Sequence, residues 1–276
     1  MKNFWAYQFI FVLTALVSTV NASSADPLRV KVNRWLEVRR PVGQVIYVNG
    51  QKSQPAKNGL RIQSVGDTII TKQGSSAVLA MDIGTGFINI AENTIVTVNR
   101  LDKGTGGGRV TQLQVKSGQV RMQIRRLTHD TSRVEISTPA GVAGVRGTEF
   151  GVSVQDNGKT GVGTKEGSVS TSAQGKTVLV NAGFQNLTIP GKSPSPPVPL
   201  QDNPRLNIRQ LVANGNQVRI VGNVDPVNLV KFFQKSINID EAGNFDVNVP
   251  LPPNRQVEAE VITPLGTQQP YQLVVP

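Results

Sequence analysis

The sequence predicts an all-β protein built from many short strands and tight turns. Three observations support this fold class: 27 glycines and 17 prolines interrupt the chain, aromatic residues make up only 5% of it, and no long segment repeats its apolar residues with the period of a helix. A chain of 276 residues is long enough for one to three domains. Each segment of the mature chain is therefore expected to be a strand, a turn or a linker.

Charge and cysteine content restrict the function. The formal net charge of +11 and the pI near 10.2 favour anionic partners such as nucleic acid, phosphorylated lipid headgroups or acidic glycans. The chain has no cysteine, which excludes disulfides, thiolate metal sites and thiol catalysis.

The N-terminal residues 1–25 are predicted to be a cleaved signal peptide. Lys2 precedes an apolar run from Phe9 to Val20, and small residues suited to cleavage after Ala22 or Ala25 follow it. This run is shorter than the roughly 20 apolar residues that a spanning helix needs, so a membrane anchor or a buried N-terminal helix is a weaker alternative. We expect a periplasmic or secreted mature chain without a stable membrane span, which makes nucleic acid an improbable partner.

A proline-rich segment is expected to divide the mature chain. Five prolines lie between residues 190 and 199, with glycine and serine among them. Such a segment is expected to form an extended spacer of about 30 Å at ~3.1 Å per residue, and a docking motif for a proline-reading domain is the alternative. The predicted organisation is an all-β domain at 27–189, a linker at 190–200 and a second domain at 201–276.

The larger domain begins with alternating strands and repeated turn signals. Leu113 and Val115 alternate with polar residues, as do Val120, Met122 and Ile124, so a hairpin with one apolar and one basic face is predicted around Ser117-Gly118. A Lys-x-Gly signature recurs, and its glycine is expected at a position that needs a positive φ. The four copies are Lys57-Asn58-Gly59, Lys72-Gln73-Gly74, Lys116-Ser117-Gly118 and Lys165-Glu166-Gly167.

Hydrophobic parity changes within residues 141–154. Val145 occupies an odd position, whereas Phe150, Val152 and Val154 occupy even ones, so a regular strand would place them on opposite faces. A β-bulge at Gly147 would insert one residue and let all of these side chains point inward.

The same bulge would bring Arg146 and Glu149 to one face. Their side chains could then pair, or Arg146 could bond carbonyl groups at the bend. We interpret this segment as a structural clamp, with contact to a partner as the alternative.

At these residues the sequence resembles a known family. Thr138-Pro139 followed by Val145, Arg146, Gly147, Thr148, Glu149 and Phe150 is similar to the hallmark of FecR-type domains. The resemblance extends over roughly residues 40 to 188, through segments such as Gly66-Asp67 and Asn181-Ala182-Gly183.

The resemblance implies a twisted all-β domain, solenoid-like or sandwich-like, with a role in signalling. Classical members hold a sigma factor through a cytoplasmic segment and relay a signal from an outer-membrane iron-siderophore receptor. Here eight residues precede the apolar run, which is too few for a sigma-binding segment. We therefore expect a free periplasmic sensor or scaffold domain of this type.

The C-terminal segment is predicted to be a small antiparallel β-sandwich. Alternating pairs such as Val218 and Ile220 are separated by turn signals at Asn214-Gly215 and at residues 240–244 and 264–266. The pattern is similar to bacterial immunoglobulin-like modules, which implies a part that extends or presents its neighbour.

No catalytic, metal or cofactor site is expected. His129 lies in a polar stretch, and the sequence spacing offers no nucleophile and orienting acid around it. Four carboxylates of the first half lack the spacing of a calcium loop: Asp67, Asp82, Glu92 and Asp102. A glycosidase that recruits two of these carboxylates from distant strands is the open alternative.

Arginines are the remaining candidate contact residues. A basic band is predicted on the outward face of adjoining strands, with a merely solvated face as the alternative. Its members are Arg109, Arg121, Arg125, Arg126 and Arg133.

Three functional hypotheses follow. The first is a non-enzymatic periplasmic sensor or scaffold that docks envelope proteins through its sheet edges and the bulge region. The second is a protein that binds peptidoglycan or another anionic polymer through the basic face. The third is a component of a metal or siderophore signal relay with a separate membrane partner.

Overall fold

Strands make up most of the molecule, which confirms the all-β class. The computed structural model describes residues 34–82 and 84–276, which belong to one compact unit. The predicted signal peptide lies outside the described residues. In the part that the structure describes, no helix has the length and apolar character needed to cross a membrane.

The first part of the molecule contains 17 strands and one short 3-10 helix, η1 (Thr105–Gly107). The strands are β1 (Leu36–Val42), β2 (Val45–Asn49), β3 (Lys52–Pro55), β4 (Arg61–Ile62), β5 (Thr68–Thr71), β6 (Ser76–Met81), β7 (Gly86–Ile90), β8 (Ile95–Lys103), β9 (Arg109–Ile124), β10 (Arg133–Ser137), β11 (Val142–Val145), β12 (Glu149–Val154), β13 (Thr160–Glu166), β14 (Ser168–Ala173), β15 (Lys176–Asn181), β16 (Phe184–Thr188) and β17 (Val198–Pro199).

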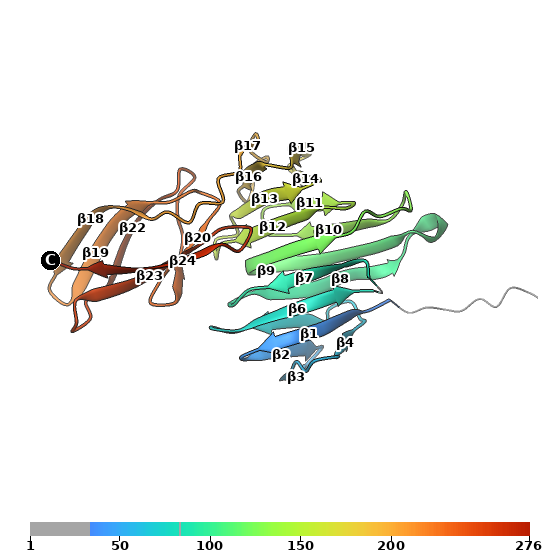
Figure 1. The fold of residues 1–276 in the computed structure, drawn as a ribbon, viewed down its shortest axis with the longest axis horizontal. Helices are drawn as coiled ribbons and strands as arrows, with labels where there is room; N and C mark the ends of the chain where they lie inside the picture. The colour runs from blue at the N-terminus through green and yellow to red at the C-terminus, as the bar shows by residue number, and fades with distance from the viewer. Residues whose placement is uncertain (1–33, 83) are drawn as a thin grey trace, which may run out of the picture. The chain divides into compact units, whose positions relative to one another are not determined.

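These strands form two sheets that share β9. Sheet A has the order β4-β1-β6-β7-β9-β12-β13-β16-β17, and sheet B has the order β3-β2-β5-β8-β9-β10-β11-β14-β15. Apart from a step back at the first strands, each sheet follows chain order, so both grow in the same direction (Figure 1). The domain thus combines the packing of a sandwich with the progression of a solenoid.

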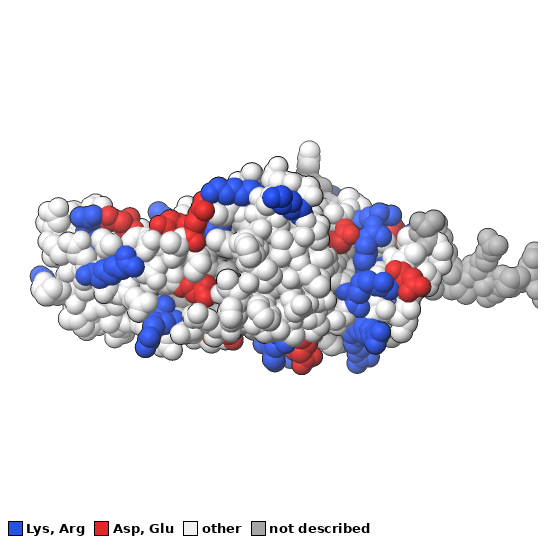
Figure 2. Space-filling view, turned by 90° about the horizontal axis from the view of Figure 1, so that it is seen from above, with Lys and Arg blue, Asp and Glu red and all other residues white. Residues whose placement is uncertain are grey.

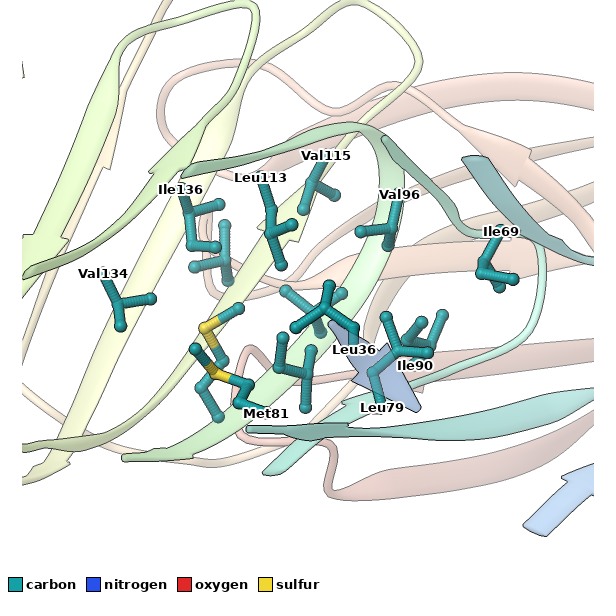
Figure 3. Close-up of a cluster of buried hydrophobic side chains, with 14 of the residues drawn as sticks. Leu36, Ile69, Leu79, Met81, Ile90, Val96, Leu113, Val115, Val134 and Ile136 are labelled. Carbon is teal, nitrogen blue, oxygen red and sulfur yellow. The ribbon is translucent and has the colours of Figure 1, made fainter. Parts of the chain in front are cut away.

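One hydrophobic core lies between the two sheets. Leu36, Leu79 and Met81 of sheet A face Leu113 and Ile136 of sheet B (Figure 3), and these side chains are at most 1% exposed. Alternation produces this core, because every second residue of a strand points to the same side.

The chain passes repeatedly between the sheets, and glycines stand where it crosses. All four glycines of the Lys-x-Gly signature have a positive φ: +84° at Gly59, +64° at Gly74, +95° at Gly118 and +75° at Gly167. The positive φ was expected, but the hairpin turns predicted at Gly118 and Gly167 are wrong. Each lies where the chain leaves one sheet for the other, so the signature marks sheet crossings.

The hairpin predicted around Ser117-Gly118 is wrong. β9 continues through Gly118 as one strand of 16 residues. Its first part pairs with β8 in sheet B, and its second part pairs with β7 and β12 in sheet A. Leu113 and Val120 are both buried because the core lies on opposite sides of the strand before and after the crossing.

The C-terminal module consists of two antiparallel sheets around a second core. Its strands are β18 (Asn207–Asn214), β19 (Gln217–Asn223), β20 (Leu229–Phe232), β21 (Lys235–Ile237), β22 (Asn244–Pro250), β23 (Gln256–Ile262) and β24 (Gln268–Val274). The sheet orders are β18-β19-β22 and β21-β20-β23-β24. Phe232 and Phe245 meet edge to face between the sheets, with ring centroids 5.7 Å apart. The immunoglobulin-like identity of this module stays a prediction.

The proline-rich segment is not the free spacer that the sequence suggested. Val198–Pro199 forms β17, which pairs with β16. The Ser195 amide donates to the Leu187 carbonyl at 2.8 Å, and the Asn186 side chain donates to the Ser195 carbonyl at 3.4 Å. Backbone groups between the prolines therefore extend the edge of sheet A.

Candidate functional site

The two halves of the family motif lie at opposite ends of β11. Thr138-Pro139 forms the turn that enters β11, where the Thr138 hydroxyl receives a hydrogen bond from the Thr160 hydroxyl at 2.9 Å. Arg146-Gly147-Thr148 follows the last residue of the strand. The motif therefore fixes both connections of one short strand.

The parity change at Gly147 has a different cause from the predicted bulge. β11 belongs to sheet B and β12 to sheet A, and the chain crosses between the two sheets at Gly147, whose φ is +144°. Val145 and Phe150 are both buried because they approach the same core from opposite sheets. An irregularity does occur nearby, but it lies in the pairing of Glu149 and Phe150 with β13.

Arg146 and Glu149 do not pair, which corrects the predicted clamp. The exposed Arg146 guanidinium donates to the His129 carbonyl at 3.3 Å and to the Asp130 carboxylate at 3.4 Å. Arg146 thus bonds a carbonyl of the loop at residues 125–132, whereas the alternative expected carbonyl groups at the bend itself.

Glu149 is instead held by two other cations. Its carboxylate accepts hydrogen bonds from Arg121 and from Lys165. Burial raises the pKa of Glu149, but these hydrogen bonds outweigh burial and leave the pKa below its ordinary value. Glu149 is therefore an ionised anchor in sheet A.

The crossing holds the dipeptide Arg125-Arg126 in place. Ile124 and Thr148 exchange two backbone hydrogen bonds of 3.0 Å, and the Leu127 amide donates to the Arg146 carbonyl at 2.8 Å. A Cβ atom on Gly147 would lie 2.6 Å from the Arg126 Cα. Only glycine permits this approach, so the motif positions these two arginines.

Four loops meet at this end of the sandwich, which we call the arginine end; their described residues are 82, 84–85, 104–108, 125–132 and 146–148. The Arg125 amide donates to the Thr85 carbonyl at 3.0 Å, and the His129 ring contacts the Gly106 carbonyl at 2.9 Å. Because a carbonyl oxygen only accepts, His129 Nε2 carries the proton in this contact. His129 thus links two loops.

The predicted basic residues do not form one band. Arg121 pairs with Glu149 in sheet A, and Arg133 pairs with Glu135 in sheet B at 2.7 Å. Arg109, Arg125 and Arg126 instead line one groove of about 430 Å³ at the arginine end. Figure 2 shows one face of the molecule, where acidic side chains stand among the basic ones.

A buried ion pair at this end was missed by the sequence analysis. Arg34 bonds the Asp82 carboxylate through Nε at 3.0 Å and through Nη2 at 2.7 Å. Its Nη1 also donates to the carbonyls of Asp102 and Val110. The partners are 48 or more residues away in sequence, so no local pattern indicates them.

The other carboxylates considered for catalysis have separate partners. Asp67 is buried and accepts hydrogen bonds from the amides of Gln63 and Ser64 at 3.1 and 3.0 Å. Glu92 binds Lys231, and Asp102 binds Arg100 at the surface. Among residues 34–82 and 84–276, no group of three metal-binding side chains gathers.

The opposite end of the same strands faces the C-terminal module, and we call it the module-facing end. Lys159 is 3% exposed and donates to the carbonyls of Ile239 and Asp240 at 2.8 and 2.6 Å. Burial lowers the pKa of Lys159 to about 8, although Asp240 and Glu241 act in the opposite direction. Lys231 of the module is also buried and binds Glu92 and Glu260.

Glycines in β12 and β13 make room for the module. A Cβ atom on Gly151 would lie 1.8 Å from the Pro264 carbonyl oxygen, and one on Gly161 would lie 2.6 Å from Val227 Cβ. Glycine in a strand interior can mark such a close approach, and this signal was present in the sequence but was not used.

Sheets A and B together have four edges among the described residues, and three of these are blunted. β4 and β17 have two residues each, and β17 contains Pro199. β3 carries Lys52 and Pro55. The Ala56 amide donates to the Val45 carbonyl, so the backbone groups of the preceding residue, Pro55, face away from β2. Short length, lysine and proline are the usual protections against edge pairing.

The fourth edge, β15, is open. It has six residues, Lys-Thr-Val-Leu-Val-Asn, and pairs with β14 on one side only. The Val178 carbonyl and the Ala182 amide point toward β14, since they bond Thr171 and Gly167. The backbone groups of Thr177, Leu179 and Asn181 therefore face outward, and Leu179 is 55% exposed.

A family model described as FecR protein matches residues 67–170. No curated protein matches the chain. Two structures of a candidate anti-sigma factor from Parabacteroides distasonis ATCC 8503, at 2.50 and 1.65 Å resolution, are similar to 48% of this chain with TM-scores of 0.40 and identities of 12% and 13%. The match covers 59% of that factor, so this chain spans less than two thirds of its length.

A polysaccharide lyase aligns with 88% of this chain and 40% of its own length, at 10% identity and a TM-score of 0.20. The residues that the FecR family model matches hold Thr138-Pro139 and the segment from Val145 to Phe150.

Proposed function

We propose that the protein is a non-enzymatic scaffold or sensor of the cell envelope, and that it docks another envelope protein by adding a strand of that protein to β15. The FecR match supports a role in signalling. The observation that carries the docking site is the contrast, within sheets A and B, between the open edge β15 and the three blunted edges β3, β4 and β17. We place the mature protein in the periplasm, on the strength of the apolar N-terminal run and the cleavage residues that follow it.

Strand addition uses the backbone of the open edge. The outward groups of Thr177, Leu179 and Asn181 can form a regular ladder with an extended segment of the partner. The side chains of these residues lie on the outer face of sheet B, where the exposed Leu179 offers an apolar contact. We therefore expect a partner segment that is extended and has an apolar side chain opposite Leu179.

The experiment compares proline at the open edge with proline at a blunted edge. Leu179→Pro removes an outward amide from β15, whereas Ser53→Pro removes an outward amide from β3. The purified mature chain and both variants are immobilised, incubated with an envelope extract and washed at about 1 M salt, where the Debye length is about 3 Å.

We expect one defined protein to remain bound to the native chain and to Ser53→Pro, and to be lost from Leu179→Pro. If Leu179→Pro retains the same protein equally well, β15 is not the docking edge. Release of all proteins at high salt would remove strand docking altogether.

A further inference from the structure

We propose that the groove at the arginine end binds a phosphate-bearing ligand through Arg109, Arg125 and Arg126. The three arginines line the same groove of about 430 Å³, together with Thr85, His129 and Ser132. This volume lies in the range of small-ligand sites. The inference concerns a different surface from β15 and does not depend on docking there.

The groove carries an excess of positive charge. Arg125 and Arg126 are exposed, and neither forms an ion pair with a carboxylate of the described residues. Arg109 Nη1 lies 3.8 Å from the Asp82 carboxylate, but Arg34 already holds that carboxylate at 2.7 Å. Asp82 is thus compensated by a buried partner, and the Arg109 side chain, which is 54% exposed, remains available.

The backbone that carries the two central arginines is fixed before any ligand binds. The Arg125 amide is bonded to the Thr85 carbonyl at 3.0 Å, and the amide of Leu127, which follows Arg126, is bonded to the Arg146 carbonyl at 2.8 Å. Gly147 packs directly under the Arg126 backbone. A ligand therefore orders two side chains and no loop, which lowers the entropic cost of binding.

The donor set favours a phosphate group. A guanidinium offers a rigid fork of N–H donors that matches an oxyanion with two oxygens at a time. Three guanidiniums on one groove match a group with three or more acceptor oxygens, such as a phosphomonoester, better than a carboxylate with two. The same chemistry occurs in a phosphorylated sugar and in a phospholipid headgroup.

Titration calorimetry with the full mature chain tests the site. The probes are inorganic phosphate, a hexose phosphate, glucuronate as a carboxylate of similar size, and vesicles of a zwitterionic lipid with or without phosphatidic acid, which carries a phosphomonoester. The test variant is Arg125→Gln/Arg126→Gln. The matched control is Arg205→Gln/Arg209→Gln, which removes two exposed arginines from the C-terminal module.

We expect the hexose phosphate or the anionic vesicles to bind the native chain, and the test variant to bind them roughly tenfold more weakly. The control should change affinity less than about twofold, since dispersed charge contributes little at moderate salt. Binding of the hexose phosphate alone identifies a soluble or glycan-borne phosphate, and binding of the vesicles alone identifies a lipid headgroup.

Three results would overturn the inference: no binding of any phosphate probe, equal weakening in the control, or glucuronate binding as tightly as the hexose phosphate. Arg126→Lys guards against a loss through misfolding, because it keeps the charge and removes the fork. Its affinity should fall between those of the native chain and the double variant. Failure of this inference leaves docking at β15 untouched, since no residue is shared.

Discussion

The two ends of the sandwich use their cations in opposite ways. At the module-facing end, Lys159 and Lys231 are buried and bonded to carbonyls or carboxylates. At the arginine end, Arg125 and Arg126 stand at the surface beside the crossing that fixes their backbone. Both cations of the first end are structural, whereas the second end combines the structural Arg34 with Arg125 and Arg126, which remain available to a ligand.

The difference follows from what covers each end. The loops of the C-terminal module remove the module-facing end from water, so a cation there must find acceptors in the fold. The arginine end has no such cover in the described chain, and water solvates its guanidiniums. Net charge alone therefore says little about function until each cation is assigned to a partner.

The largest effect is expected from filling the space where the module seats. Gly151→Val places a side chain on the Pro264 carbonyl oxygen, since even a Cβ atom would lie 1.8 Å away. We expect a loss of more than about 4 kcal/mol in the free energy of unfolding, measured by urea denaturation. Ser172→Val on the outer face of β14 is the control, and a similar loss there would contradict a specific seat for the module.

Breaking the buried pair at the arginine end comes next. Arg34→Met leaves Asp82 and two backbone carbonyls without their donor, which should cost about 3 to 4 kcal/mol. Arg219→Met removes an exposed partner of Asp246 and should cost much less, because ion pairs in water contribute little to stability. Thermal denaturation of both variants measures the difference, and equal losses would show that the buried pair has no special weight.

The pH dependence of stability tests the module-facing end. The pKa of Lys159 is about 8 in the folded chain and near 10.5 in the unfolded chain. Between these values the unfolded chain holds a proton that the folded chain lacks, so stability contributed by this group rises with pH from about 8 to about 10.5, by at most about 3 kcal/mol.

Lys159→Met removes this dependence. The difference in free energy of unfolding between the native chain and Lys159→Met, measured by denaturation at intervals from pH 7 to pH 10, should shift in favour of the native chain as pH rises. A difference that stays constant with pH would mean that burial does not lower the pKa of Lys159.

A smaller effect is expected at the sheet crossing. Gly147→Ala forces a side chain into a φ of +144° and against the Arg126 backbone. We expect a loss of about 2 kcal/mol and altered amide resonances for Arg125 and Arg126 in a two-dimensional NMR spectrum. Unchanged resonances would show that Gly147 does not position the backbone of Arg125 and Arg126.

Local patterns predicted much of this structure. The all-β class, the strand alternation of Val120 and Met122, and the positive φ of the signature glycines follow from period-two burial and from backbone sterics. These properties depend on near neighbours in the sequence.

Properties that depend on topology were not predicted. A sheet crossing and a bulge at Gly147 produce the same parity change, so the sequence could not separate them. The open edge of β15 and the Arg34–Asp82 pair depend on which strands lie side by side. The glycines that receive the module, such as Gly151, look the same in sequence as glycines of a bulge.

A partner is expected to dock at the β15 edge and not at the blunted β3 edge. Photoreactive amino acids placed at Leu179 on β15 and, separately, at Gln54 on β3 test it in living cells. The account predicts a discrete crosslinked species from position 179, containing the same partner that the salt-washed native chain retains, and none from position 54. A partner crosslinked from position 54 and not from position 179, or equally from both, would contradict it.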